Sequence, residues 1–323
     1  MKRATKSIAL LASAFVLLAA APSPVVPALA PSEIVDAAPA SDWVNIAADE
    51  LLVMDLAPDA GKQARRVVIQ LMPAPFSQGW IANIRKLAAA HWWDGTSINR
   101  VQDNYVVQWG EADGKKPLPP ALATTSQDDY SVATAKTESS ALADEINFRN
   151  VGTASSTEAI IYPDVYPGSV ARFQNGWPIA QGIDAKWPVH CYGMVGVGRD
   201  MPPDSGSGAE LYTVIGQAPR HLDRNIALVG RVISGIENLS SLPRGTGPLG
   251  FYENPEQRVV IKAIRLASEL PAGQRPRFQY LSTENATFAR YADARANRRD
   301  PFFIHPAGSA DICNVPVPIR KAP

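Results

Sequence analysis

Residues 98–110, Ile-Asn-Arg-Val-Gln-Asp-Asn-Tyr-Val-Val-Gln-Trp-Gly, are the stretch that decides the fold. The run 105–109 is rich in β-branched and aromatic residues, which favours a strand. The Gln-Asp-Asn before it is typical of a turn, so Arg100 comes just before a bend. Because side chains alternate along a strand, Val106 and Gln108 lie on one face. If the bend folds Arg100 back over that face, a guanidinium and an amide meet above an apolar floor.

A buried strand rarely tolerates two such polar groups unless each has a partner to bond. This stretch alone leaves two interpretations open. Arg100 is either the donor of a binding site or a structural arginine that closes the rim of a barrel.

The spacing of this stretch resembles a motif of the cyclophilin-type peptidylprolyl isomerases. That motif is an arginine, four residues, Phe-Met, one residue, Gln, and then a turn that contains glycine. Here Arg100 is followed at the same spacing by Tyr105-Val106, by Gln108 and by Trp109-Gly110.

Three further segments follow in the order that the family uses. Residues 193–198 resemble its Leu-Ser-Met-Ala-Asn-Ala-Gly segment, which forms one wall of the substrate groove. Residues 210–216 resemble its Asn-Gly-Ser-Gln-Phe-Phe-Ile strand, and 221–223 its Trp-Leu-Asp turn. The likeness covers about residues 51–266, with a long interruption.

The resemblance implies a mainly β fold, a closed eight-stranded antiparallel barrel capped by two helices. We expect the helices at 81–90 and 233–242, and a further helix at about 282–298 in a C-terminal extension. The expected domain organisation is a signal peptide (1–30), a flexible leader (31–48), a cyclophilin-like domain (49–266) with an insertion at about 111–145, and a C-terminal extension (267–323).

By the same resemblance, Arg100 donates to the twisted amide and Gln108 helps to place the prolyl carbonyl. No cofactor and no nucleophile are needed for this chemistry. The expected substrates are proline-containing polypeptides, and we expect a monomer. The residues expected to bind substrate are Tyr105, Val106, Val195, Gly196, Val197, Glu210, Tyr212, His221 and Leu222.

Several positions depart from the family pattern, and some of them change the pocket. The shorter side chain at 106 shortens the pocket floor, and a carboxylate at 210 near Arg100 could orient the arginine or compete for its donors. We expect a divergent but active isomerase; the alternative is a non-catalytic chaperone or scaffold that binds proline peptides in the same groove. The departures are Val106 for Met, Gly196 for Asn, Glu210 for Gln, His221 for Trp and Ile226 for His.

The N-terminus has the three parts of a secretory signal. Basic residues in 1–6 precede an apolar run at 8–21, which small residues and prolines follow. The run is short for a transmembrane helix. The sequence leaves two cleavage sites possible, one after Ala21 and one after Ala30. We expect a periplasmic or secreted protein with no stable membrane association after processing; the alternative is an uncleaved anchor.

Charge, histidine and cysteine content bear on nucleic-acid binding, metal binding and disulfide formation. Lys and Arg total 31, as do Asp and Glu, so nothing in the charge balance suggests a nucleic-acid partner. The four histidines lack metal-ligand spacing, and we expect no metal. Cys191 and Cys313 form a disulfide in an oxidising compartment or remain two buried thiols, and the sequence leaves both open.

Overall fold

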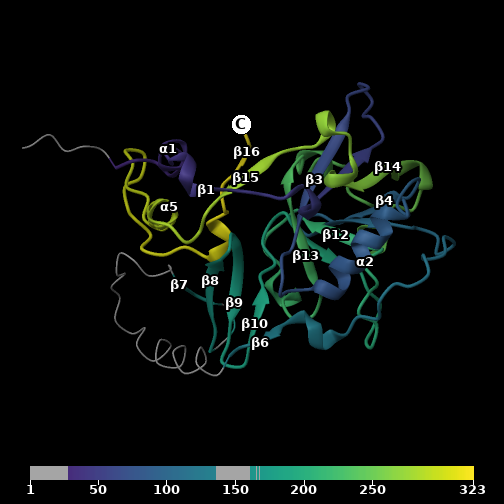
Figure 1. Ribbon diagram of the computed structural model, residues 1–323, viewed down its shortest axis with the longest axis horizontal. Coiled ribbons are helices and arrows are strands. Elements are labelled where there is room, and N and C mark those ends of the chain that lie inside the picture. Colours follow the sequence, from purple (N-terminus) through teal and green to yellow (C-terminus); the bar gives the residue numbers. More distant parts are fainter. Residues whose placement is uncertain (1–27, 136–160, 165, 167) are drawn as a thin grey trace, which may run out of the picture.

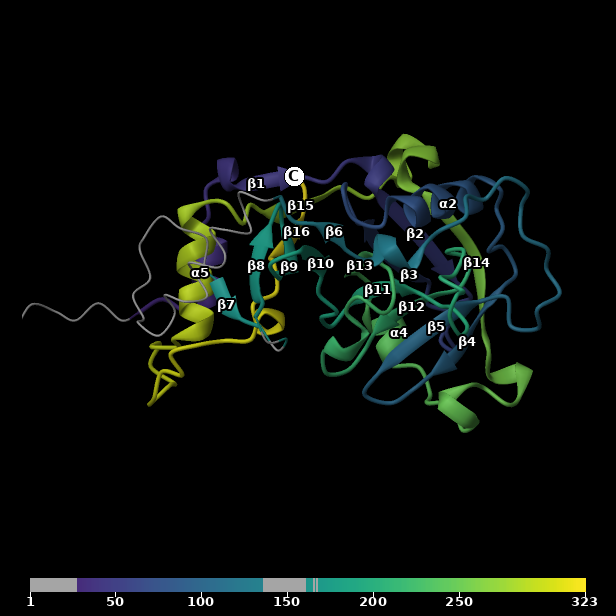
Figure 2. The same ribbon diagram turned by 90° about the horizontal axis from the view of Figure 1, so that it is seen from below.

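The computed structural model describes residues 28–135, 161–164, 166 and 168–323, which form two lobes side by side (Figure 1). A β-barrel makes up one lobe, on the right in Figures 1 and 2. The second lobe combines the N-terminal segment, the chain between two barrel strands and the C-terminal extension. The expected signal peptide lies almost wholly in residues 1–27, outside the described part.

The barrel has eight strands in the closed order β11-β12-β5-β4-β14-β2-β3-β13, and every neighbouring pair is antiparallel. Closure leaves no strand edge exposed. The predicted closed eight-stranded antiparallel barrel is therefore confirmed. Its strands are β2 (Leu51–Leu56), β3 (Arg65–Leu71), β4 (Ser97–Val101), β5 (Val106–Gly110), β11 (Met194–Val197), β12 (Leu211–Val214), β13 (Leu228–Ser234) and β14 (Val259–Leu266).

One of the two expected capping helices is present at full length. Helix α2 (Gln78–Ala89) buries Trp80, Ile84 and Leu87 along one stripe, because these residues recur at helical spacing. The prediction of a second helix at 233–242 is wrong over most of that range.

The chain at 233–242 instead continues β13 to Ser234 and then forms one helical turn, α4 (Glu237–Ser240). Gly235 has a φ of +82°, a left-handed conformation that a helix cannot contain. A Cβ at Gly235 would lie 2.1 Å from the carbonyl oxygen of Arg66, so the chain passes too close to β3 for any other residue. Pro243 stops the helix on its other side.

The insertion is longer than expected. The chain leaves the barrel after Gly110 and returns only at Met194, well beyond the predicted end at about 145. The apolar residues of 170–188 form no barrel strand. They make up three strands of a separate five-stranded sheet, whose order is β6-β10-β9-β8-β7. Its strands are β6 (Val132–Ala133), β7 (Ile161–Pro163), β8 (Val170–Gln174), β9 (Trp177–Gln181) and β10 (Ala185–Pro188).

Residues 31–48 do not form a flexible leader, contrary to the prediction from their Pro-Ala-rich composition. They contain α1 (Pro31–Asp36) and β1 (Trp43–Asn45), and both are packed. Ile34 is buried in the hydrophobic core, and Trp43 pairs with Leu281 in the three-stranded sheet β1-β15-β16. A few large apolar side chains are enough to dock the segment onto the C-terminal extension. The partner strands are β15 (Phe278–Leu281) and β16 (Ile319–Lys321).

The C-terminal extension contains the expected helix in a shorter form, α5 (Ala286–Ala296). The side chain of Asn285 caps it by accepting from the backbone N–H of Phe288 at 2.8 Å. Phe288 also contacts Phe173 of β8, with ring centroids 4.9 Å apart, which joins the extension to the inserted sheet.

Cys191 and Cys313 form a disulfide, which decides between the two possibilities left by the sequence. The bond ties the C-terminal tail to the segment just before β11, across 122 residues of chain. Within the described part of the chain, no helix combines the length and apolarity that a membrane span requires.

Candidate active site

The β4–β5 hairpin brings Arg100 and Gln108 together. The two residues are cross-strand partners, and the register shifts between Ile98 and Arg100. Such a bulge re-aims the side chains that follow it. Asn104 takes a left-handed conformation, with a φ of +49°, in the turn between the strands. The bend expected from Gln-Asp-Asn therefore folds the arginine back over the strand that carries Gln108.

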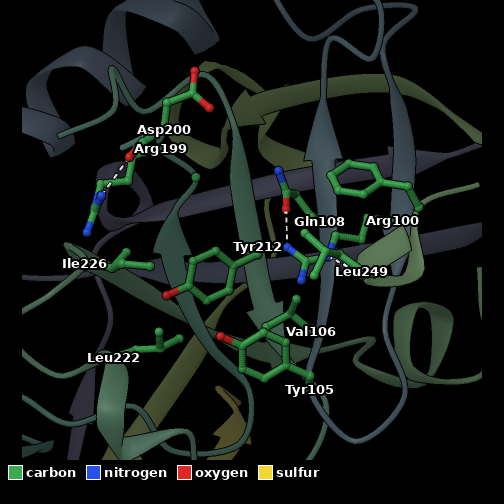
Figure 3. Close-up of a pocket in the computed structure, with 12 residues that line it drawn as sticks. Arg100, Tyr105, Val106, Gln108, Arg199, Asp200, Tyr212, Leu222, Ile226 and Leu249 are labelled. Atoms are coloured by element: carbon green, nitrogen blue, oxygen red, sulfur yellow. Dashed lines mark hydrogen bonds between the residues drawn. The ribbon is translucent and has the colours of Figure 1, made fainter. Parts of the chain in front are cut away.

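Three nitrogens of the Arg100 guanidinium donate to oxygen acceptors, and Figure 3 shows the bonds to Gln108 and Leu249. Nη1 donates to Oε1 of Gln108 at 3.1 Å. Nε donates to the carbonyl oxygen of Leu249 at 2.7 Å, and Nη2 donates to Oε1 of Gln102. These bonds fix the plane of the guanidinium.

Two aromatic rings flank the same guanidinium. Its central carbon lies 5.7 Å from the ring centroid of Tyr105 and 5.4 Å from that of Phe251. These distances are in the range of cation–π contacts. Partial burial lowers the pKa of Arg100, because removal of water disfavours the charged form. An arginine nevertheless stays charged at neutral pH.

A cavity of about 300 Å³ lies beside Arg100. Part of its wall is apolar, and the ring of Tyr212 lies there, facing the guanidinium (Figure 3). Val106 and Tyr212 are buried and pack against Tyr105, Leu222 and Ile226. The residues that line the cavity are Arg100, Tyr105, Val106, Gln108, Gly198, Arg199, Asp200, Tyr212, Leu222, Ile226, Leu249 and Phe251.

The structure brings six of the residues singled out from the sequence to this cavity: Arg100, Tyr105, Val106, Gln108, Tyr212 and Leu222. His221 is not among the lining residues; it is exposed to solvent and stacks on Tyr105 with ring centroids 6.1 Å apart.

Val195, Gly196 and Val197 do not line the cavity, contrary to the expectation for the 193–198 segment. Both valines are buried in the main hydrophobic core, with at most 1% of their surface exposed. Gly196 lies under the ring of Tyr212, since a Cβ there would be 2.3 Å from the phenol oxygen. The groove wall is built one step later along the chain, by residues 198–200.

Glu210 also lies off the cavity, next to Gln108. Its carboxylate covers Gly110 and accepts from the backbone N–H of Glu111 at 2.7 Å. Burial raises the pKa of Glu210 to about 7. The backbone bond from Glu111 and the side chains of Asn99 and Gln108 oppose this rise.

Leu249 and Phe251 were missed by sequence reasoning. They belong to the loop before β14, which reaches the site because Gly250 packs against Gln102: a Cβ on that glycine would be 2.7 Å from the Cα of Gln102. Phe251 also forms a β-bridge with Arg100. The Gly-Pro-Leu-Gly run at 247–250 signals a tight turn, but nothing in it indicates what the turn contacts.

Among solved structures, the chain is similar to cyclophilin AquaCyp293 from Hirschia baltica, with a TM-score of 0.61 and 19% identity over 86% of this chain and 92% of that chain. It also matches a cyclophilin type peptidyl-prolyl cis-trans isomerase from Cryptosporidium parvum, solved in the presence of the dipeptide ala-pro. That match has a TM-score of 0.35 and 11% identity, over 66% of this chain and 98% of that chain. The first likeness shows the shared fold.

No curated protein matches the chain. Residues 63–266 match the family described as cyclophilin type peptidyl-prolyl cis-trans isomerase/CLD. This match takes in all the barrel strands except β2, and the cavity with Arg100 lies within it. The chain therefore belongs to the cyclophilin-type peptidyl-prolyl isomerase family.

Proposed function

We propose that the cavity beside Arg100 catalyses cis-trans isomerisation of X-Pro peptide bonds. The observation that carries the proposal is a charged, planar donor held beside a cavity of about 300 Å³, part of whose wall is apolar. Rotation about the X-Pro bond is slow because amide resonance opposes it, with a barrier of roughly 18–20 kcal/mol. In the twisted amide the nitrogen regains its lone pair, and a nearby N–H donor stabilises that state.

The described residues divide this task between them. Gln108 accepts from Arg100 and so holds the guanidinium at one orientation. The apolar wall formed by Val106, Tyr212 and Leu222 is suited to a pyrrolidine ring and excludes water from it. No nucleophile takes part, since no covalent bond is broken.

The test is NMR exchange spectroscopy on an Ala-Pro peptide with and without the protein. We expect the wild type to accelerate exchange and Arg100→Ala to lower this acceleration about 100-fold, the usual effect of removing a preorganised donor. Arg244→Ala is the matched control, because Arg244 is a nearby arginine that pairs with Asp103 away from the cavity. Equal exchange in wild type and Arg100→Ala would overturn the proposal.

Non-catalytic binding of proline peptides is the second candidate. It is favoured by the acceptors that already occupy one N–H each on Nε, Nη1 and Nη2 of Arg100, because a donor with three of its five N–H groups engaged has fewer to offer a substrate. The same spectra separate the two functions. A binding module shifts the peptide resonances and leaves the exchange rate unchanged.

Exported polypeptides are the clients that we propose for this site. The proposal is supported by the secretory pattern of residues 1–30 and by the Cys191–Cys313 disulfide, since disulfides persist in oxidising compartments. Cell fractionation and N-terminal sequencing of the mature protein test it. We expect the chain outside the cytoplasm with Met1 removed by cleavage after Ala21 or Ala30. A cytoplasmic protein with an intact N-terminus would contradict it.

A further inference from the structure

The hydroxyl of Tyr212, whose ring forms part of the cavity wall, is tied to a buried histidine. The Tyr212 hydroxyl lies 3.0 Å from Nε2 of His190, and Nδ1 of His190 lies 2.8 Å from Oδ1 of Asp223. A carboxylate only accepts, so Nδ1 donates to Asp223, and an imidazole with its single proton on Nδ1 has an acceptor at Nε2. The tyrosine hydroxyl therefore donates to His190.

The network continues away from the cavity through two more charged groups. Nε of Arg220 donates to Oδ2 of Asp223 at 2.6 Å, and Nη2 of Arg220 pairs with Asp164. The side chains of His190, Asp223 and Asp164 are at most 1% exposed. Each of these buried polar groups thus has a partner.

The members of the network come from both lobes. His190 follows β10 and Asp164 follows β7, so both belong to the inserted chain of the second lobe. Tyr212 lies in barrel strand β12, while Arg220 and Asp223 belong to the turn that carries the cavity residue Leu222. The wall of the cavity is thus joined to the second lobe through side chains that water does not reach.

This arrangement matters for a proline pocket because a phenol hydroxyl is a polar group at the back of an apolar wall. A buried hydroxyl without an acceptor is costly, and water or a displaced ring would satisfy it. The bond to His190 removes both outcomes. It keeps the Tyr212 part of the wall apolar and holds the ring of Tyr212 over Gly196.

We propose that His190 is a positioning residue of the isomerase site: by accepting the hydrogen bond of Tyr212, it holds that ring as the wall against which the substrate proline packs. The second lobe thereby completes the prolyl pocket of the barrel. This inference rests on the function proposed above.

A matched pair of substitutions tests it. His190→Asn keeps a polar atom near the position of Nδ1, within reach of Asp223, and loses the bond to Tyr212. His190→Gln places its amide near the position of Nε2, within reach of Tyr212. We expect His190→Asn to weaken binding of an Ala-Pro peptide about tenfold, because it leaves a buried hydroxyl unpaired. We expect His190→Gln to remain within about threefold of wild type.

Two further measurements show whether the effect passes through the tyrosine. In the Tyr212→Phe background, where the hydroxyl is absent, His190→Asn should cause no further loss of affinity. The exchange rate at saturating peptide should fall less than the affinity, because Arg100 is untouched. Equal losses in His190→Asn and His190→Gln, or additive losses with Tyr212→Phe, would overturn the proposal.

The Tyr212 ring can also be observed without any peptide, which separates this proposal from the proposed function. In protein labelled with ¹³C in its tyrosine rings, the Tyr212 resonance is identified by its absence in Tyr212→Phe. We expect it to shift or broaden in His190→Asn and to stay near its position in His190→Gln. An unchanged resonance in His190→Asn refutes the positioning role even if the wild type proves catalytic. A shifted resonance in a protein that does not accelerate exchange leaves the positioning intact and removes the isomerase function.

Discussion

The cavity has two sides that are built in opposite ways. On one side, Arg100 and Gln108 come from a single hairpin, and the guanidinium is only partly buried. On the other side, Tyr212 is held by residues from separate segments of both lobes, and their side chains are almost completely buried. The donor side of the cavity is therefore held largely by residues close in the chain, and its guanidinium is half-buried. The wall that carries Tyr212 depends on long-range packing.

The largest effect is expected at the disulfide, because Cys191 directly follows His190, the hydrogen-bond partner of Tyr212. The double variant Cys191→Ser/Cys313→Ser frees a loop of 122 residues in the unfolded chain. We expect its free energy of unfolding to fall by about 5 kcal/mol on the chain-entropy account of such a loop. Urea denaturation followed by circular dichroism measures it. A loss below about 1 kcal/mol would mean that the β15–β16 pairing and α5 hold the tail without the bond.

Asp223→Ala tests the buried network itself. It leaves Arg220 with one carboxylate instead of two and leaves Nδ1 of His190 without an acceptor. We expect a loss of about 3 kcal/mol in unfolding free energy, because removal of one partner of a buried ion pair leaves the other charge buried without full compensation.

Asp103→Ala is the matched control for that variant. Asp103 also pairs with an arginine, Arg244, but its side chain is 78% exposed. We expect no measurable change in stability, since solvent screens an exposed pair. Equal losses in the two variants would show that burial does not distinguish the two sides of the cavity.

Glu210 makes the Arg100 side sensitive to pH. Because burial raises its folded pKa to about 7, the folded state binds more protons than the unfolded state between about pH 4.5 and 7. Its contribution to stability is therefore fully present below pH 4.5 and is lost as the pH rises through 7. We expect a fall on the order of 3 kcal/mol over this range.

Glu210→Gln should remove this part of the pH dependence, because the amide mimics the protonated acid. The measurement is the urea midpoint at pH 5, 6, 7 and 8 for both proteins. An unchanged slope in the variant would assign the titration to another group.

The local half of the site is the half that the sequence predicted. The spacing of Arg100, Tyr105-Val106 and Gln108 corresponds to a hairpin whose geometry depends on residues close in the chain. The barrel could be predicted because residues 98–110, 193–198 and 210–216 resemble segments of one family in the order that it uses. Val195 and Val197 were misplaced because a strand with both faces buried has no alternation that distinguishes wall from core.

The other half depends on contacts that no local pattern carries. Buried apolar residues such as Trp177 and Ile179 fit a second sheet as well as a barrel. The sequence therefore could not reveal that β8 and β9 pair with each other. His190 lacked any metal-ligand or catalytic spacing, and its partners Tyr212 and Asp223 are distant in the chain. Its role follows from the tertiary structure alone.

The smallest expected effect concerns the loop over Arg100, where the backbone rather than the side chain makes the contact. Leu249 has a φ of +57° and an exposed side chain, while its carbonyl oxygen accepts from Nε of Arg100. Leu249→Gly keeps that carbonyl in a conformation that glycine adopts readily. We therefore expect peptide affinity to fall by no more than about threefold, roughly 0.6 kcal/mol for an exposed apolar contact.

Leu249→Pro is the contrasting variant, because proline requires a φ near −65° and must displace the carbonyl. We expect it to slow peptide exchange clearly more than Leu249→Gly does, in spectra recorded side by side. If the glycine variant were the more damaged of the two, the side chain of Leu249 would be the contact that matters. The Arg100 side would then depend on tertiary packing as the tyrosine side does, and the contrast between the two sides of the cavity would fail.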